Sequence, residues 1–298
     1  MPNYYTLPDL ASRNLLDAGE RKPARLAVLG CPIGHSASPV MHQAALDAAG
    51  IEARYVRLEV PVGRVGEALA RLRELGFIGC NVTVPHKLEA MAACDEVAES
   101  ARVLGAVNTI RFDADGMHGF NTDGPGFVRS LASELGVELA GRKVAILGAG
   151  GGAGQALAAQ CVMEGVAGLV LVNRTVAKLA DLAARLRALR ADVAIEALSF
   201  DGAGLAAACL ACDGIVNASS VGLKPGDPAI LPAGCLRREH WVYDCIYQPP
   251  VTPLLALAGE VGCRTANGRG MLIQQGALAF QHWFPSSDPL AVMAAALG

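Results

Sequence analysis

The 298-residue sequence is poor in aromatic residues and has no long apolar run. Only 5% of its residues are Phe, Trp or Tyr, so small and branched aliphatic side chains must build most of the core. No apolar stretch approaches the roughly 20 residues that cross a bilayer, and Met1–Glu20 lacks the apolar segment of a secretory signal. We therefore expect no membrane partner and a cytoplasmic location.

The sequence also lacks a large excess of positive or negative charge. The formal net charge is −3, and no basic tract or stripe appears. Nucleic acids and anionic membranes are bound by clustered cations, so we expect neither as a partner. The hydrophobic fraction of 52% excludes a disordered chain and suits a globular α/β protein.

The cysteines show neither a disulfide framework nor a metal-site spacing. Their number is nine, which is odd, and they are scattered along the chain, as expected in a reducing compartment. Cys209 and Cys212 form one C-x-x-C, but no second ligand pair follows at a matching spacing. We expect ordinary buried thiols and no metal.

Strand-like and helix-like patterns alternate along both halves of the chain. This alternation predicts an α/β fold with parallel sheets covered by helices, the sheet of the first domain being mostly parallel. A chain of 298 residues suits two domains, and we place the boundary near Asp123, between residues 1–123 and 124–267. The expected strands are 26–30, 54–60, 79–84, 107–112, 117–120, 143–147, 169–173, 194–198, 214–217 and 241–244. A single helix is expected over 87–101, and an apolar helix over 271–284.

A glycine-rich turn follows the strand at 143–147 and leads into a helix. Gly148, Gly150 and Ala153 fit the pattern G-x-G-x-x-A. The first glycine allows a tight turn, the second lets the backbone approach a pyrophosphate, and the small third residue allows close packing of helix and strand. The helix N-terminus offers free N–H groups to the phosphates. The turn predicts a dinucleotide site in a Rossmann domain.

The residues after the next strand decide which dinucleotide is bound. Sites specific for NAD place an acidic residue there to accept hydrogen bonds from the ribose 2′-hydroxyl. This chain has Asn173, Arg174 and Thr175 instead. Arg174 can bind a 2′-phosphate, and Lys178, one helical turn on, adds a second cation. The sequence therefore predicts NADP(H).

Polar side chains that suit hydride transfer to a carbonyl gather in three segments of the first domain. They lie at or beyond expected strand ends, where open α/β sheets bind ligands. They are Ser36, Ser38, Thr83, Lys87, Asn108 and Asp123. Each also has a structural interpretation: the serines and Asp123 as helix caps or turn residues, and Lys87 as a solvated residue in a first helical turn. The residues alone leave both interpretations open.

Seven ordered segments resemble the shikimate dehydrogenase family, over about residues 26–284. They are Pro32–Pro39, Asn81–Lys87, Gly105–Thr109, Asn121–Gly124, Asn173–Thr175, Tyr243–Tyr247 with Thr252–Leu255, and Gly268–Gln275. The resemblance implies reversible, NADPH-dependent reduction of 3-dehydroshikimate to shikimate, in chorismate and aromatic amino-acid biosynthesis. It also implies an N-terminal substrate domain to which residues 268–298 return, a C-terminal Rossmann domain, a cleft between them, and a monomer or homodimer.

The resemblance also implies roles for single residues. Ser36, Ser38 and Tyr247 would hold the substrate carboxylate. Thr83, Asn108, Asp123 and Gln275 would bind the ring hydroxyls, and Lys87 would be the acid/base, paired with Asp123. The residues expected to line NADP(H) are Gly148, Ala149, Gly150, Gly151, Gly152, Asn173, Arg174, Thr175, Lys178, Cys245 and Gly268. For His35 and His86 we expect structural or orienting roles.

Departures from the family pattern and competing functions accompany this resemblance. Gly154 stands where many members carry an arginine, Gln43 replaces a common asparagine, and Ser219–Leu223 replaces the usual Thr-Ser-x-Gly-Met. A quinate/shikimate dehydrogenase of the same family is the nearest alternative, followed by an aminoshikimate-type enzyme. A non-catalytic NADP-binding sensor is a third, but such a protein would be expected to lose Lys87 or Asp123.

Overall fold

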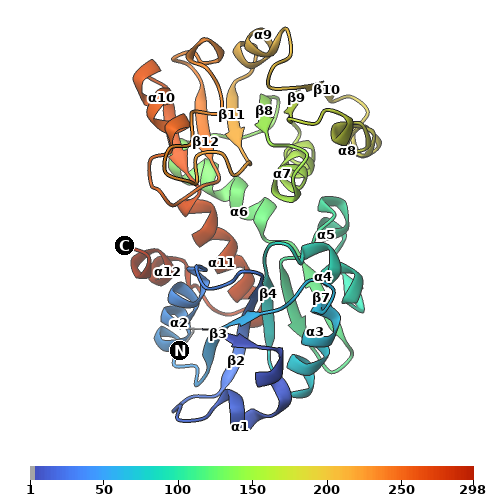
Figure 1. Ribbon diagram of the computed structural model, residues 1–298, viewed down its shortest axis with the longest axis vertical. Helices are drawn as coiled ribbons and strands as arrows, with labels where there is room; N and C mark the ends of the chain where they lie inside the picture. The colour runs from blue at the N-terminus through green and yellow to red at the C-terminus, as the bar shows by residue number, and fades with distance from the viewer. Residues whose placement is uncertain (1–3) are drawn as a thin grey trace. The chain divides into compact units, whose positions relative to one another are not determined.

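The computed structural model describes residues 4–298, and the chain divides into two compact units. Unit 1 comprises Met1–Asp123 with Ile273–Gly298, and unit 2 comprises Gly124–Leu272 (Figure 1). The first three residues of the segment for which we expected no secretory signal lie outside the described part. Among residues 4–298, none of the helices has the length and apolarity to cross a membrane.

Unit 1 contains a seven-stranded sheet that is mostly parallel, as expected. The strand order is β1-β3-β2-β4-β6-β7-β5. The pairs among β1, β3, β2 and β4 are parallel, whereas β6 runs antiparallel to both β4 and β7. The strands are β1 (Tyr5–Thr6), β2 (Ala24–Gly30), β3 (Arg54–Glu59), β4 (Gly79–Val82), β5 (Glu96–Val97), β6 (Thr109–Phe112) and β7 (Met117–Phe120).

Helices cover this sheet and close one apolar core. Leu29, Leu58, Leu69 and Ile110 are among its fully buried side chains, and aliphatic residues dominate it, as the scarcity of aromatics predicts. The helices are α1 (Arg13–Leu16), α2 (Ser38–Ala48), α3 (Val65–Glu74), α4 (Lys87–Ala93), α5 (Glu99–Leu104) and α12 (Leu290–Ala296), with the 3₁₀ turn η1 (Leu7–Ala11). The helix α11 (Arg269–Trp283) spans the boundary between the units.

The single helix expected over 87–101 is wrong. The helix α4 ends at Ala93, Cys94 turns to extended geometry, and the chain forms the short strand β5 before α5. Asp95 is bonded twice to Met117: its N–H donates to the Met117 carbonyl at 3.0 Å, and its carboxylate accepts from the Met117 N–H at 2.8 Å. Pairing with a strand distant in sequence thus overrides the local helical pattern.

Unit 2 contains a six-stranded, fully parallel sheet with the order β10-β9-β8-β11-β12-β13. Successive strands β8, β9 and β10 follow one another toward one side of the sheet, whereas β11, β12 and β13 follow one another toward the other side. The direction of the strand order therefore reverses between β8 and β11. In such sheets the ligand binds at this reversal, beyond the carboxyl ends of the strands. The strands are β8 (Lys143–Leu147), β9 (Gly168–Val172), β10 (Ala194–Leu198), β11 (Gly214–Asn217), β12 (Trp241–Asp244) and β13 (Arg264–Asn267).

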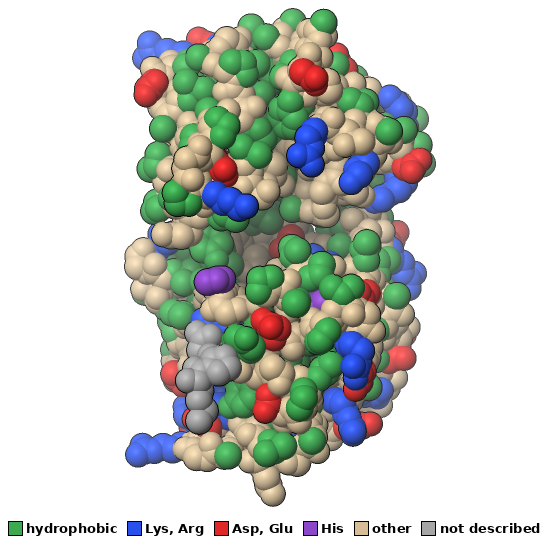
Figure 2. All heavy atoms as spheres, in the orientation of Figure 1, with side chains coloured by type: hydrophobic (Ala, Val, Ile, Leu, Met, Phe, Trp, Pro, Cys, Tyr) green, Lys and Arg blue, Asp and Glu red, His purple; other side chains and the backbone are tan. Residues whose placement is uncertain are grey.

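The helices of unit 2 complete the Rossmann-type arrangement that we expected. They are α6 (Asp123–Ser130), α7 (Gly152–Met163), α8 (Ala177–Leu189), α9 (Leu205–Leu210) and α10 (Pro253–Val261), with the π-helical turn η2 (Leu131–Leu135) and the 3₁₀ turn η3 (Ala233–Cys235). The short helices α9 and α10 and the strand β13 were not among the expected elements. Figure 2 shows acidic and basic side chains interspersed over the visible face of each unit.

Candidate functional site

The strand directions of unit 1 explain why the polar segments meet at one edge of its sheet. The serine-bearing loop follows β2, and Thr83 follows β4, at the carboxyl edge of two parallel neighbours. Because β6 runs antiparallel to β4, its first residues return to that edge, and Asn108 lies directly before it. The next reversal brings the end of β7, and with it Asp123, to the same edge.

Lys87 and Asp123 form an ion pair at this edge. The Lys87 ammonium lies 2.6 Å from Oδ2 of Asp123, and the two side chains are 26% and 16% exposed. Lys87 begins α4 and Asp123 begins α6, so both are held at helix starts. The pair is therefore mostly, but not fully, shielded from solvent.

His86 anchors the start of α4 beside Lys87. Its imidazole is fully buried, and Nε2 lies 2.7 Å from the carbonyl oxygen of Val60, directly after β3. This contact holds the residue before Lys87 in place. His35, by contrast, is exposed in the serine-bearing loop.

Asn108 fixes the backbone that leads to Asp123. Its Oδ1 accepts from the Thr122 N–H at 2.8 Å, and its Nδ2 donates to the Thr122 hydroxyl at 3.0 Å. The side chain is only 2% exposed, so both ends of the amide are engaged inside the protein. Asn121 adds a further restraint, since its Oδ1 accepts from the Asp123 N–H at 3.0 Å.

Neither serine of the loop caps the following helix, although the residues alone allowed that interpretation. The helix α2 begins at Ser38, and the residue at its cap is Ala37, with no side-chain cap. The Ser36 hydroxyl instead accepts from the Ser38 N–H at 3.3 Å. Arg57 holds the loop from β3, because its guanidinium donates twice to the Ser36 carbonyl oxygen, at 2.7 and 3.1 Å.

The remaining residues expected to bind substrate lie on separate elements. Thr83 is half-buried just after β4, and Gln275 lies on α11 within unit 1. Tyr247 belongs to unit 2, in the loop after β12, where burial raises the pKa of its hydroxyl.

The glycine-rich turn of unit 2 connects β8 to α7. Gly148 takes a positive φ of 77° directly after β8, and α7 begins at Gly152. A Cβ at Gly150 would lie 2.7 Å from the Asn173 side chain, so that side chain packs directly on the turn and leaves no room for a larger residue at 150. Free N–H groups at the start of α7 then face the same edge.

The close-packing role that we expected for Ala153 is wrong. Ala153 is exposed, whereas Gly154 is buried. A Cβ at Gly154 would lie 2.5 Å from the Gly148 carbonyl oxygen and 2.7 Å from Cα of Ala149. Helix α7 therefore turns residue 154, one position later, toward the strand.

A cavity of about 540 Å³ lies over this edge of unit 2. Arg174 and Lys178 line it together with the glycine turn, so two cations border a site large enough for part of a dinucleotide. Its lining residues are Gly148, Gly150, Gly151, Asn173, Arg174, Thr175, Lys178, Phe200, Ser219, Ser220, Val221, Pro228, Ala229 and Ile230.

Sequence reasoning missed several residues of this cavity. Phe200 comes two residues after β10, so the rule that ligands bind beyond strand ends could have found it. The loop at Pro228–Ile230 gave no such signal. Cys245 and Gly268, which were expected, do lie together: they follow the paired strands β12 and β13, and the Gly268 N–H donates to the Ile246 carbonyl at 3.2 Å.

A buried amide and a buried carboxylate form hydrogen bonds with the loops at this edge of the unit 2 sheet. The Asn217 amide donates to both Asp244 oxygens at 3.1 Å, and its Oδ1 accepts from the Ser219 hydroxyl at 2.7 Å. Asp244 also accepts from the Ile246 N–H at 3.0 Å, and burial raises the pKa of its carboxyl. The pair thus orients the loops after β11 and β12.

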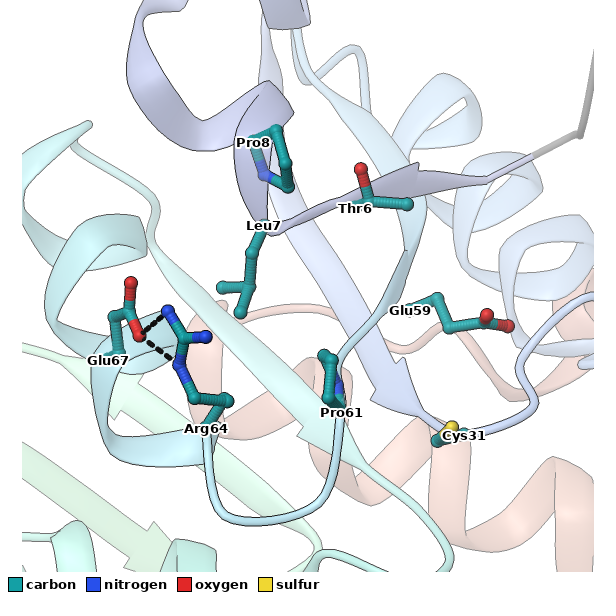
Figure 3. Close-up of a pocket in the computed structure, with 8 residues that line it drawn as sticks. All are labelled: Thr6, Leu7, Pro8, Cys31, Glu59, Pro61, Arg64 and Glu67. Carbon is teal, nitrogen blue, oxygen red and sulfur yellow. Dashed lines mark hydrogen bonds and ion pairs between the residues drawn. The ribbon is translucent and has the colours of Figure 1, made fainter.

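Another cavity, of about 440 Å³, lies in unit 1 at the ends of β1 and β3 (Figure 3). None of the residues expected in the site lines it. Leu7 and Pro61 face it, and the ion pair of Arg64 with Glu67 borders it on one side, as Figure 3 shows.

All nine cysteines are free thiols. Cys209 and Cys212 are fully buried, and burial raises the pKa of these thiols to about 12 and about 11, respectively. Both are therefore protonated, unreactive core residues, as expected.

Two family models and several relatives match this chain. Residues 28–110 match the model of the shikimate dehydrogenase substrate binding domain, and residues 268–297 match that of the shikimate 5'-dehydrogenase C-terminal domain. Shikimate dehydrogenase (NADP(+)) of Symbiobacterium thermophilum is 43% identical over 285 residues, covering 92% of this chain and 93% of the relative. The enzyme of the same name from Methanopyrus kandleri is 38% identical, with 90% and 92% covered.

Solved structures show the same fold with different ligands. Shikimate 5-dehydrogenase of Thermus thermophilus, in complex with NADP(H) and shikimate, is 34% identical with a TM-score of 0.80, covering 92% of this chain and 98% of that one. Quinate dehydrogenase of Corynebacterium glutamicum with NAD gives 31% and 0.81, covering 91% and 97%. Ligand-free 5-ketofructose reductase of Gluconobacter sp. strain CHM43 gives 32% and 0.83, covering 94% and 99%.

Proposed function

Because the chain belongs to the shikimate dehydrogenase family, and is thus an NADP-dependent oxidoreductase, we propose that it interconverts 3-dehydroshikimate and shikimate. The observation that carries this proposal is the Lys87–Asp123 ion pair, at 2.6 Å, on the ligand-binding edge of unit 1. A sensor without catalysis has no need of such a pair. The family places the reaction in chorismate and aromatic amino-acid biosynthesis.

Lys87 acts as the proton donor of the reduction. When bound, NADPH supplies a hydride to the C3 ketone carbon, and the ketone oxygen gains negative charge. The Lys87 ammonium stabilises that charge and then gives its proton to the oxygen, which leaves a neutral alcohol and a neutral amine. Asp123 orients the ammonium at 2.6 Å and accepts a hydrogen bond from the reacting hydroxyl in the reverse direction.

The carboxylate and the ring hydroxyls of the substrate are bound by neutral polar groups. Ser36, Ser38 and Tyr247 donate hydroxyls to the carboxylate. Thr83 and Gln275, with Asp123, bind the ring hydroxyls. Asn108, which we also expected to bind them, is 2% exposed and acts instead by holding Thr122 beside Asp123. The placement of Ser38, Thr83 and Asp123 at one sheet edge supports this division.

NADP(H) is held by unit 2. The glycine turn from Gly148 to Gly152 and the start of α7 bind the pyrophosphate, while Arg174 and Lys178 bind the 2′-phosphate, with Asn173 and Thr175 beside them. Cys245 and Gly268 line the remaining part of the cofactor site. The enzyme acts in the cytoplasm, as a monomer or homodimer, on a small-molecule substrate.

Steady-state assays of the full chain test this proposal. Shikimate and quinate are each oxidised with NADP and with NAD, and 5-ketofructose is reduced with NADPH. We expect the highest kcat/KM with shikimate and NADP. Turnover of quinate with NAD alone, or of 5-ketofructose alone, would assign the chain to another branch of the family.

A further inference from the structure

Tyr55 of β3 lies at the centre of a buried polar network between the serine-bearing loop and the segment that carries Asp123. We propose that Tyr55 is a positioning residue: it holds α2, which begins at Ser38, while its hydroxyl binds Asn81, and so it fixes the spacing between the carboxylate-binding end and the proton-transferring end of the substrate site. This inference rests on the proposed function and adds a residue to it.

Tyr55 contacts the end of the serine-bearing loop through α2, which begins at Ser38. Ser38 and His42 are four residues apart and thus lie on the same face of that helix. The Tyr55 ring stacks on the His42 ring, with centroids 4.4 Å apart and an angle of 4° between the planes. The Tyr55 N–H also donates to Oε1 of Gln43 on the same helix, at 3.0 Å. Tyr55 therefore holds α2, the helix that begins at Ser38.

The other contacts of the network lead toward Asp123. The Tyr55 hydroxyl donates to Oδ1 of Asn81 at 2.7 Å, and Nδ2 of Asn81 donates to Oγ1 of Thr109 at 3.0 Å. The Thr109 hydroxyl donates to Oδ1 of Asn108 at 3.0 Å. That same oxygen accepts from the Thr122 N–H, one residue before Asp123. The chain of bonds is thus continuous from Tyr55 to the backbone beside the acid/base pair.

Burial assigns Tyr55 a positioning role. Tyr55 is 5% exposed and Asn81 6% exposed, so neither side chain offers a surface to a substrate. Residues 57 and 59 of β3 share the face of Tyr55 and also hold the loop: Arg57 through the Ser36 carbonyl, and Glu59 through the Ile33 N–H at 3.4 Å. Side chains of strand β3 therefore hold the serine-bearing loop in place.

A double-mutant cycle on kcat/KM for shikimate with NADP tests the coupling. Tyr55→Phe removes only the hydroxyl and keeps the ring on His42; we expect about a tenfold fall, the typical effect of one lost hydrogen bond. If Tyr55 acts through Ser38, then Tyr55→Phe changes the Ser38→Ala variant by less than about twofold. Independent, additive losses in the double variant would overturn the proposal, as would a Ser38→Ala variant with unchanged kcat/KM.

Tyr243→Phe is the matched control. Tyr243 is also fully buried and shares its hydroxyl with Ser130 at 2.9 Å, but it lies in unit 2. We expect both variants to lower Tm by a similar amount, and only Tyr55→Phe to lower kcat/KM. Equal losses of kcat/KM in the two variants would show that Tyr55 affects activity only through the stability of the protein, and would contradict the proposal. A wild-type chain that does not turn over shikimate overturns the proposed function itself, whereas an active chain with an additive cycle overturns this inference alone.

Discussion

Gly154 faces the carbonyl oxygen of Gly148 so closely that a Cβ at residue 154 would lie 2.5 Å from that oxygen. Real Cβ atoms do not approach backbone atoms to that distance, so the turn must shift if a side chain is added. The chain has a glycine where helix and turn meet. In the proposed function, phosphate binding there depends on backbone N–H groups, and recognition of the 2′-phosphate depends on Arg174 and Lys178.

A Gly154→Ala variant is expected to bind NADPH more weakly, by about tenfold or more, because the shifted turn misplaces the N–H groups that face the pyrophosphate. Its Tm should fall as well, since overpacking typically costs 1–3 kcal/mol, taken as about 2 here. Nucleotide fluorescence titration and thermal unfolding measure both effects. Gly259→Ala in α10 is the control: nothing lies within 4 Å of its Cβ, so its Tm should be unchanged or raised. Equal behaviour of the two variants would show that the turn tolerates a side chain.

Arg174→Ala is expected to weaken NADPH binding about 10- to 100-fold and to leave NADH binding nearly unchanged. The lost interaction is a charge-assisted contact with the 2′-phosphate, which NADH lacks. Arg187→Ala, on the exposed side of the same helix α8 that carries Lys178, is the matched control. Dissociation constants for both nucleotides check this expectation. A similar loss for NADH would instead indicate that Arg174 stacks on the adenine.

His42 should make the stability of the protein pH-dependent. Burial lowers the pKa of His42 from 6.5 to about 3, so the folded state keeps a neutral ring where the unfolded chain takes up a proton. The stabilisation is complete above pH 6.5 and is lost as the pH falls toward 3, at about 1.4 kcal/mol per pH unit. Urea unfolding at pH 7 and pH 5 should therefore differ by about 2 kcal/mol from this residue.

Replacement of the same residue isolates its contribution. His42→Phe keeps an aromatic ring against Tyr55 and removes the titrating group, so the difference between pH 7 and pH 5 should shrink by about 2 kcal/mol. His35→Gln, at an exposed position, should leave the difference as in the wild type. An unchanged pH dependence in His42→Phe would mean that other groups control it.

The order of strand and helix patterns in the sequence predicted much of the fold. It also predicted the sheet edge at which the candidate site lies. The alternation of apolar runs with helical patterns requires parallel strands, and parallel strands place their following loops on one edge. The pairing of Lys87 with Asp123 could not be predicted in this way. Their positions in the sequence did not decide whether either residue is functional or structural, and only the resemblance to a family implied that they act as a pair. The structure then brings the two side chains to 2.6 Å.

Long-range contacts explain what the sequence did not reveal. The break after Ala93 is caused by Met117, which captures both the backbone and the side chain of Asp95. The loop at Pro228–Ile230 reaches the cofactor cavity from a distant part of unit 2, without a motif of its own. The exchange of roles between Ala153 and Gly154 depends on the rotation of α7, which a glycine pattern does not encode.

Turnover by Lys87→Ala tests the proposed catalysis most directly. Removal of one member of a well-placed acid/base pair typically lowers the rate by about 10²- to 10⁴-fold. We predict a fall of kcat in this range for shikimate oxidation with NADP, together with an NADPH dissociation constant within about threefold of the wild type, because the proposed nucleotide site lies in unit 2 and Lys87 lies in unit 1. A folded Lys87→Ala enzyme with a near-normal kcat would contradict the assignment of Lys87 as the proton donor.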